Sequence, residues 1–150
     1  MKLLFIRHSL AVERDEFEGH DFDRPLSEKG VKRAKKFFKH IKEIYPQIDY
    51  ILTSKALRAK QTAKILNSFY HTEYEEHSLL FPGATITDLK EVLKGKEGIV
   101  AIVGHEPDLS GFLKELMYAP NLKIKFKKPS LAEFEEELKS LIHYKHFEGI

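Results

Sequence analysis

The chain has 150 residues, of which 42% are hydrophobic and 32% charged, a balance typical of a globular protein with one core. It contains no cysteine, which excludes disulfide bonds and thiolate metal sites, and its net charge of +2 gives no strong field to attract nucleic acid. No apolar run is long enough for a signal peptide or a membrane span. We therefore expect one domain over residues 1–150, in the cytoplasm, with no nucleic-acid or membrane partner.

The first predicted element is a buried strand that ends in chemically active residues. An apolar run from Lys2 to Ile6 is followed directly by Arg7, His8 and Ser9. Open α/β sheets bind their ligands at the carboxyl ends of such strands. Arginine offers a planar fork of donors for phosphate, and a neutral imidazole can attack phosphorus. This strand end therefore suggests phosphoryl chemistry.

Strand and helix signals then alternate along the chain. Apolar spacing, N-caps and glycine or proline stops define the elements that we expect. In chain order they are a loop over 10–24, a helix from an N-cap at Ser27 to Pro46, a strand over 49–54, a helix over 55–69, a strand over 73–77, a short helix that begins at a Thr85–Asp88 capping box, a strand over 99–103 and a helix after Pro107. This order predicts an α/β fold, a three-layer α/β/α domain with a largely parallel mixed sheet.

Two segments near the carboxyl terminus each allow two interpretations. Residues 123–128 alternate lysines with apolar side chains, which favours a strand with a solvated lysine face over a nucleic-acid site. Over residues 130–142, Ser130 with Glu133 resembles a capping box, and the apolar spacing favours a helix. Ala132, Phe134 and Glu136 also alternate as in a strand.

Four side chains converge if the sheet is parallel. Arg7 and His8 follow the first strand, Arg58 lies in the first turn after the second, and His105 follows the central one. The free N–H groups at a helix start also favour an anion near Arg58. Two arginines and two imidazoles can neutralise and orient a phosphoryl group without a metal. Ser54, just before the second helix, is interpreted as its cap.

The motifs that carry these residues resemble those of a known family. They are Arg7-His8, Arg24-Pro25-Leu26-Ser27-Glu28-Lys29-Gly30, Thr53-Ser54 through Leu57-Arg58-Ala59 with Gln61-Thr62, and Val103-Gly104-His105. In this order they resemble the histidine phosphatase superfamily, and SixA-type phosphohistidine phosphatases most of all. The resemblance implies a phosphoglycerate-mutase-like fold, in which residues 130–146 would pair as strands.

The same resemblance implies roles for the site residues. His8 would be the nucleophile and form a phosphohistidine intermediate, while Arg7, Arg58 and His105 would hold the phosphoryl oxygens. Neighbouring cations would lower the pKa of His8 from about 6.5 and keep its base form. Ser9 is a further candidate for substrate binding. The last candidates are Arg24, which either lines the site or anchors the loop, and the loop residues His20, Asp21 and Asp23, where we expect no metal site and no cofactor.

Two residues depart from the family pattern. Ser9 stands where a glycine is usual, so its side chain either strains the turn or adds a hydroxyl at the phosphate. Glu106 places a carboxylate directly after His105, close to the expected anion unless it turns outward. These departures keep open a non-catalytic phosphate-binding adaptor.

A third departure bears on the substrate. Larger superfamily members place an acidic proton donor after the third strand, but His77 to Leu80 contains no carboxylate. General acid catalysis supplies about 10²–10⁴-fold, which an alkoxide leaving group needs more than an imidazole does. We therefore expect a phosphoprotein substrate with a phosphohistidine domain, the alternative being a small-molecule phosphomonoesterase. Carboxylates that could still supply a proton are Asp21, Asp23, Glu75, Glu76 and Glu106.

Overall fold

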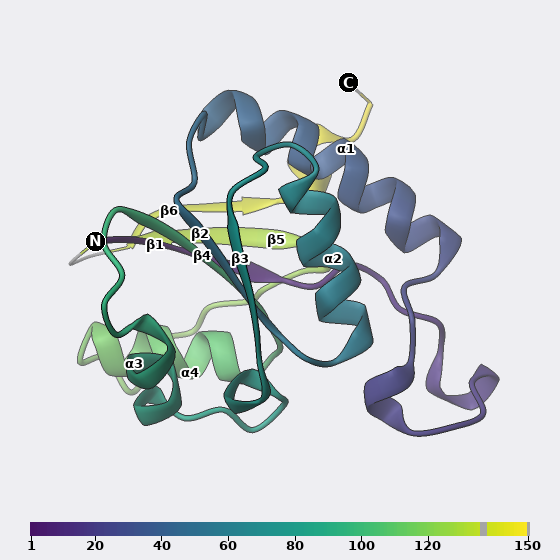
Figure 1. The fold of residues 1–150 in the computed structure, drawn as a ribbon, viewed down its shortest axis with the longest axis horizontal. Helices are drawn as coiled ribbons and strands as arrows, with labels where there is room; N and C mark the ends of the chain where they lie inside the picture. Colours follow the sequence, from purple (N-terminus) through teal and green to yellow (C-terminus); the bar gives the residue numbers. More distant parts are fainter. Residues whose placement is uncertain (136–137, 150) are drawn as a thin grey trace.

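The computed structural model describes residues 1–135 and 138–149, which form one six-stranded sheet covered by helices (Figure 1). The strands are β1 (Lys2–Arg7), β2 (Tyr50–Ser54), β3 (Glu73–His77), β4 (Ile99–Gly104), β5 (Ser130–Phe134) and β6 (Leu138–His143). The α-helices are α1 (Glu28–Ile44), α2 (Leu57–Asn67), α3 (Ile86–Leu93) and α4 (Asp108–Leu116). Short 3₁₀ turns are η1 (Arg14–Glu16), η2 (Asp21–Asp23), η3 (Ser78–Leu80) and η4 (Tyr144–Phe147).

The sheet is mixed and largely parallel, as predicted. Its order is β3-β2-β4-β1-β5-β6, with β1 to β4 parallel and β5 and β6 antiparallel to their neighbours. Arg7 pairs with Gly104, and Thr53 pairs with Val103, so β1, β2 and β4 end at the same level. The residues that follow these three strands therefore meet at one edge of the sheet.

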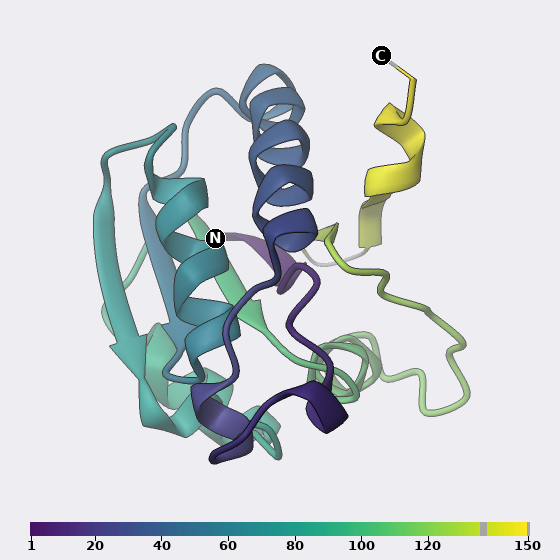
Figure 2. The ribbon, with the colours of Figure 1, turned by 90° about the vertical axis from the view of Figure 1, so that its right-hand side faces the viewer.

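Alternation along the strands produces two cores, one on each face of the sheet. Leu4 and Ile6 pack with α1 and α2, whereas Leu3 and Phe5 pack with α3 and α4. Successive strand side chains point to opposite faces, so β1 contributes to both cores. The result is the expected three-layer α/β/α arrangement, and Figure 2 shows the loop between β1 and α1 at the same end of the molecule as the start of α4.

Capping residues start α1 and α3 where the sequence predicts them. The Ser27 side chain accepts a hydrogen bond from the backbone N–H of Gly30 at 3.0 Å, and Thr85 with Asp88 forms a reciprocal capping box. Gly30 also permits a close approach, because a Cβ there would lie 1.9 Å from the carbonyl oxygen of Leu10. This contact joins the loop after β1 to the start of α1. Within the described chain, no helix has the length and apolarity to cross a membrane.

Two local predictions near the carboxyl terminus are wrong. The segment 123–128 alternates in burial but belongs to no strand in the structure, where it connects α4 to β5. The helix favoured over residues 130–142 is replaced by the hairpin of β5 and β6, as the family resemblance implies. Pairing with β1 decides this, since it buries Leu131 and Ala132 in the two cores. Glu136, part of the strand-like alternation, lies outside the described residues.

Candidate active site

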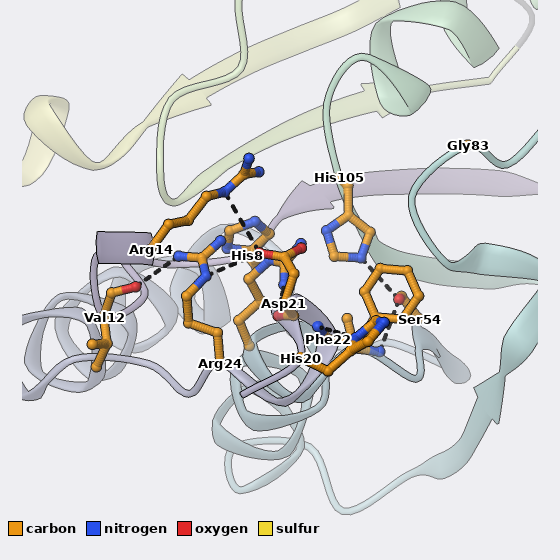
Figure 3. A network of polar contacts seen from close by, with 12 residues as sticks. His8, Val12, Arg14, His20, Asp21, Phe22, Arg24, Ser54, Gly83 and His105 are labelled. Atoms are coloured by element: carbon orange, nitrogen blue, oxygen red, sulfur yellow. Dashed lines mark hydrogen bonds and ion pairs between the residues drawn. The ribbon is translucent and has the colours of Figure 1, made fainter. Parts of the chain in front are cut away.

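The sheet edge brings the four expected side chains together. The rings of His8 and His105 lie 5.2 Å apart between centroids, at an interplanar angle of 56° (Figure 3). Arg58 and Arg7 are close enough to lower the pKa of both histidines electrostatically. A cluster of two guanidinium groups and two imidazoles thus lies at the carboxyl ends of β1 and β4 and the start of α2.

His8 has a neutral ring, and one of its two nitrogens is free to react. Its Nδ1–H donates to the carbonyl oxygen of Ser9 at 2.7 Å, since a carbonyl can only accept. The lone pair is therefore on Nε2. Burial lowers the pKa of His8 well below 6.5, and His105, Arg58 and Arg7 lower it further. At pH 7 the ring is in the form that can attack an electrophile.

His105 is also buried and neutral, and it contacts the neighbouring strand. Burial lowers its pKa to about 3, with contributions from Arg58 and Arg7. Its Nε2 lies 2.8 Å from Oγ of Ser54, the last residue of β2. Its Nδ1 is buried and has no hydrogen-bond partner among the described residues. In Figure 3 that nitrogen is on the side of the ring that faces His8.

Among the guanidinium nitrogens of Arg7, Nη1 is hydrogen-bonded and the buried Nε is not. Its Nη1 donates to the carbonyl oxygen of Phe126 at 2.7 Å, which anchors the guanidinium, while its Nε is buried without a partner in the described structure. Burial lowers the pKa of Arg7, although Glu106 raises it. An unsatisfied buried polar atom costs about 1–3 kcal/mol. The unpaired Nε of Arg7 and Nδ1 of His105 in one pocket suit an oxyanion ligand.

Arg58 pairs with the carboxylate of Asp21, a residue that the sequence analysis assigns to the loop after the first strand without predicting this contact. Its Nη1 donates to the carbonyl oxygen of Asp21 at 2.9 Å, and its Nη2 lies 3.3 Å from Oδ2 of the same residue. Burial lowers the pKa of Arg58, and Asp21 partly reverses this. Burial also raises the pKa of Asp21, but Arg58 and Arg24 lower it below its usual value overall. Asp21 is therefore ionised at neutral pH.

Arg24 anchors the loop in this structure. Its Nη1 donates to the carbonyl oxygen of Val12 at 2.7 Å, and its Nε donates to Asp21 at 3.1 Å. Arg14 adds a third cation, 3.5 Å from the same carboxylate. The loop is further joined to the segment after β3, where Phe22 stacks on Phe81 at 4.5 Å. Of the two alternatives for Arg24, these contacts match the anchor rather than a ligand of the substrate.

Ser9 faces the helix and not the phosphoryl pocket. Its hydroxyl donates to the carbonyl oxygen of Gly30 at 2.7 Å, and its backbone N–H donates to Oγ1 of Thr62 at 3.1 Å. Both donors of this fully buried residue are thus engaged. The hydroxyl is engaged within the protein, and a contact of Ser9 with substrate stays a prediction. The side chain thus contacts α1 and the backbone N–H contacts α2, while the carbonyl oxygen of the same residue accepts from His8.

Three of the other candidate carboxylates, those of Glu75, Glu76 and Glu106, make their hydrogen bonds or ion pairs with partners other than Arg7 and Arg58. Glu106 accepts from the backbone N–H of Ser110 at 2.8 Å and from its hydroxyl, so its carboxylate is engaged with the first turn of α4. Glu75 pairs with His77 and Lys96, and Glu76 accepts from Tyr74. Among the carboxylates that contact a described partner, Asp21 is the one that contacts a site arginine.

Lys128 was not predicted from the sequence, and Ser54 was predicted only as a cap. Lys128 is half-buried, and burial together with Arg7, Arg24 and Arg58 lowers its pKa. It precedes β5 by two residues, where Ser130 pairs with Arg7, so it lies at the same edge of the sheet. Its place depends on the pairing of β5 with β1, for which the local sequence has no signal. Ser54 accepts from the backbone N–H of Ala56 at 3.1 Å, but the N-cap of α2 is Ala56, without a side-chain cap, so the interpretation of Ser54 as the cap is wrong. Across the part of the chain that the structure describes, no cluster of acidic or histidine side chains could hold a metal ion.

Arginines and neutral histidines at this edge of an α/β sheet can bind an oxyanion and stabilise the charge that develops on it, as phosphoryl transfer requires. Residues 3–80 match the model of the histidine phosphatase superfamily (branch 1), and the chain belongs to that superfamily. An uncharacterised protein of Picosynechococcus sp. (strain ATCC 27264 / PCC 7002 / PR-6) is 32% identical over 126 residues, which cover 79% of this chain and 74% of that protein.

Solved structures share the fold along nearly the whole chain. A structure of the protein histidine phosphatase SixA complexed with tungstate matches with a TM-score of 0.83 and 19% identity, over 97% of this chain and 99% of that one. A phosphoglycerate mutase from Plasmodium falciparum matches with a TM-score of 0.65 and 15% identity, over 99% and 92% of the two chains. The fold is thus phosphoglycerate-mutase-like, as predicted. Family membership and the SixA-like fold support phosphatase activity.

Proposed function

We propose that this protein is a metal-independent phosphatase that transfers a phosphoryl group to Nε2 of His8 and acts on phosphohistidine in proteins. One observation carries the proposal. The hydrogen bond from Nδ1 of His8 to Ser9 leaves the lone pair on Nε2, and burial keeps the ring unprotonated. A neutral imidazole beside two arginines has the form needed for nucleophilic attack on phosphorus.

The reaction then takes two displacement steps. Nε2 of His8 forms a bond to phosphorus as the bond from phosphorus to the leaving imidazole breaks, and the released imidazole takes a proton from water. A second water molecule then attacks phosphorus, the bond to Nε2 breaks, and inorganic phosphate leaves. Each step places negative charge on the three phosphoryl oxygens. Donors already in place around these oxygens lower the barrier.

Three side chains are suited to hold these oxygens. Arg58 and Arg7 supply charge and directed donors, and the buried Nδ1 of His105 faces His8 (Figure 3). Burial lowers the pKa of both guanidinium groups, so a bound dianion stabilises their charged forms. Tungstate, with which the similar SixA structure is complexed, is a tetrahedral oxyanion like phosphate.

The carboxylates of the site support a phosphohistidine substrate over a phosphate ester. Asp21 is ionised by its pairing with Arg58 and Arg24, so it does not carry a proton to donate at neutral pH. Glu106 is engaged with Ser110 at the start of α4. An ester leaving group without a general acid loses about 10²–10⁴-fold in rate, whereas imidazole leaves more readily. The site is therefore matched to the weaker N–P bond.

The test compares three matched substrates in the presence of a chelator. A peptide that carries phosphohistidine, the same peptide with phosphoserine, and a simple alkyl phosphate are incubated with the wild-type protein and with His8→Ala. We expect release of phosphate from the phosphohistidine peptide by the wild type alone. Equal turnover of the alkyl phosphate would favour a small-molecule phosphomonoesterase, and binding without turnover would favour an adaptor.

A further inference from the structure

The position of one proton on His105 decides what this ring can do in the pocket. Because burial and the nearby arginines hold its pKa near 3, the ring is neutral at pH 7 and carries a single N–H. One ring nitrogen contacts Ser54, and the other is buried with no described partner. The nitrogen that carries the proton is a donor and the other is an acceptor. Only a proton on Nδ1 lets His105 donate to an anion in the pocket.

The hydrogen bonds of Ser54 favour one of the two tautomers. Ser54 is fully buried, and its Oγ already accepts from the backbone N–H of Ala56 at 3.1 Å. If Nε2 of His105 also donated to this oxygen, the hydroxyl proton of Ser54 would be left without an acceptor among the described residues. If the hydroxyl instead donates to Nε2, Ser54 is satisfied both as donor and as acceptor. A buried unsatisfied donor costs about 1–3 kcal/mol, so the second arrangement is preferred.

We propose that Ser54 is a positioning residue, whose hydroxyl donates to Nε2 of His105 and thereby keeps the ring proton on Nδ1, ready to bind a phosphoryl oxygen of the substrate. This inference rests on the proposed function only for the identity of the anion. The tautomer itself follows from contacts between β2 and the residue after β4. Ser54 and His105 are far apart in sequence but adjacent in the fold, because β2 and β4 are paired strands.

The two site histidines then have the same tautomer and opposite tasks. In His8 the carbonyl of Ser9 accepts from Nδ1, which leaves a lone pair on Nε2 for attack. In His105 the hydroxyl of Ser54 donates to Nε2, which leaves a donor on Nδ1. The backbone carbonyl of Ser9 thus leaves His8 in the tautomer that suits a nucleophile. The hydroxyl of Ser54 leaves His105 in the tautomer that suits the binding of an oxyanion. Each partner is buried, so water does not compete with either contact.

Removing the Ser54 hydroxyl tests this arrangement in turnover. In Ser54→Ala nothing holds the proton on Nδ1, and we expect kcat on the phosphohistidine peptide to fall about tenfold, less than the 10²–10³-fold for complete loss of an oxyanion donor. Ser54→Thr retains a hydroxyl and should restore most of the rate. Thr53→Val is the matched control, because its buried hydroxyl donates to the carbonyl of Ser54 and has no contact with the ring. It should leave kcat within about twofold, as expected for a group that makes no contact in the transition state.

Nitrogen NMR reads the tautomer directly and needs no turnover. In ¹⁵N-histidine-labelled wild-type protein at pH 7, Nδ1 of His105 should show a protonated, pyrrole-type signal and Nε2 an unprotonated one. Ser54→Ala should move the proton to Nε2 or give a mixture, while Ser54→Thr should resemble the wild type. Titration with tungstate should shift Nδ1 of the wild type. A wild-type proton on Nε2, or a tautomer that Ser54→Ala does not alter, would overturn the proposal.

The two readouts separate this inference from the proposed function. A wild type with the expected tautomer that hydrolyses none of the substrates would contradict the phosphatase proposal and not the role of Ser54. If Ser54→Ala does not fold, the wild-type spectrum and Ser54→Thr still decide the tautomer. Assignment of the ring signals uses His105→Gln and His8→Gln, which each remove one set of peaks.

Discussion

The guanidinium of Arg58 donates to the carbonyl oxygen of Asp21 at 2.9 Å and lies 3.3 Å from its carboxylate. One of the two arginines that we propose as phosphoryl ligands is therefore paired with an anion of the protein itself. The carboxylate comes from η2, in the loop between β1 and α1, and Arg24 and Arg14 hold it from the other side. Substrate has to share Arg58 with this carboxylate or displace it.

Neutralising Asp21 should strengthen the binding of oxyanions. In Asp21→Asn the competing charge is lost, while the backbone carbonyl still accepts from Arg58. Because partly exposed ion pairs contribute about 0.2–1 kcal/mol, we expect phosphate or tungstate to bind about twofold to fivefold more tightly by calorimetry at pH 7. Asp23→Asn, an exposed carboxylate of the same turn, should leave the affinity unchanged. Weaker binding in Asp21→Asn would mean that the carboxylate orients Arg58 for the anion.

Ser9 should matter for stability more than for turnover. Ser9→Ala removes the hydrogen bond to Gly30, and we expect the free energy of unfolding to fall by about 1 kcal/mol in urea denaturation. The rate on the phosphohistidine peptide should stay within about threefold of the wild type, because no contact to the phosphoryl group is lost. A tenfold loss of kcat with unchanged stability would show instead that the hydroxyl reaches the substrate.

The buried neutral histidines predict a stability that declines in mild acid. His105 has a folded pKa of about 3, and the pKa of His8 is also lowered well below 6.5. Below pH 6.5 the unfolded state binds protons that the folded state does not, so stability falls as pH falls and is unaffected above pH 6.5. The slope for each histidine approaches about 1.4 kcal/mol per pH unit.

Chemical denaturation between pH 7.5 and 5 measures this slope. In this range the carboxylates with lowered pKa, such as Asp21, remain ionised and do not obscure it. His105→Gln should reduce the slope of stability against pH by the contribution of one histidine. A wild-type stability that stays constant from pH 7 to pH 5 would contradict the buried neutral state of both rings.

The sequence predicted those parts of the fold and site that local signals define. Apolar runs marked β1 and β4, and the residues that end them, Arg7, His8 and His105, are polar and easily placed at a sheet edge. Caps at Ser27 and Thr85 marked the starts of α1 and α3. These features depend on neighbours in the chain, so periodicity and capping patterns reveal them.

The rest depends on contacts between distant segments. The hairpin of β5 and β6 has a helix-like local pattern, and pairing with β1 overrides it. The contacts of Arg58 with Asp21 and of His105 with Ser54 join residues 37 and 51 positions apart. No spacing rule predicts such contacts, because loop conformation and strand order bring the partners together. The sequence therefore placed the candidate site residues and missed most of the contacts that they make with distant segments.

The proposed function depends above all on transfer of the phosphoryl group to Nε2 of His8 during turnover. The direct measurement is rapid acid-free denaturation of the protein during turnover of a ³²P-labelled phosphohistidine peptide, followed by mapping of the labelled residue at alkaline pH, where phosphohistidine survives. We predict label on His8 at Nε2 in the wild type, about one equivalent or less per chain, and none in His8→Ala or His8→Gln. Unlabelled protein during steady hydrolysis, or undiminished hydrolysis by His8→Ala, would contradict the account.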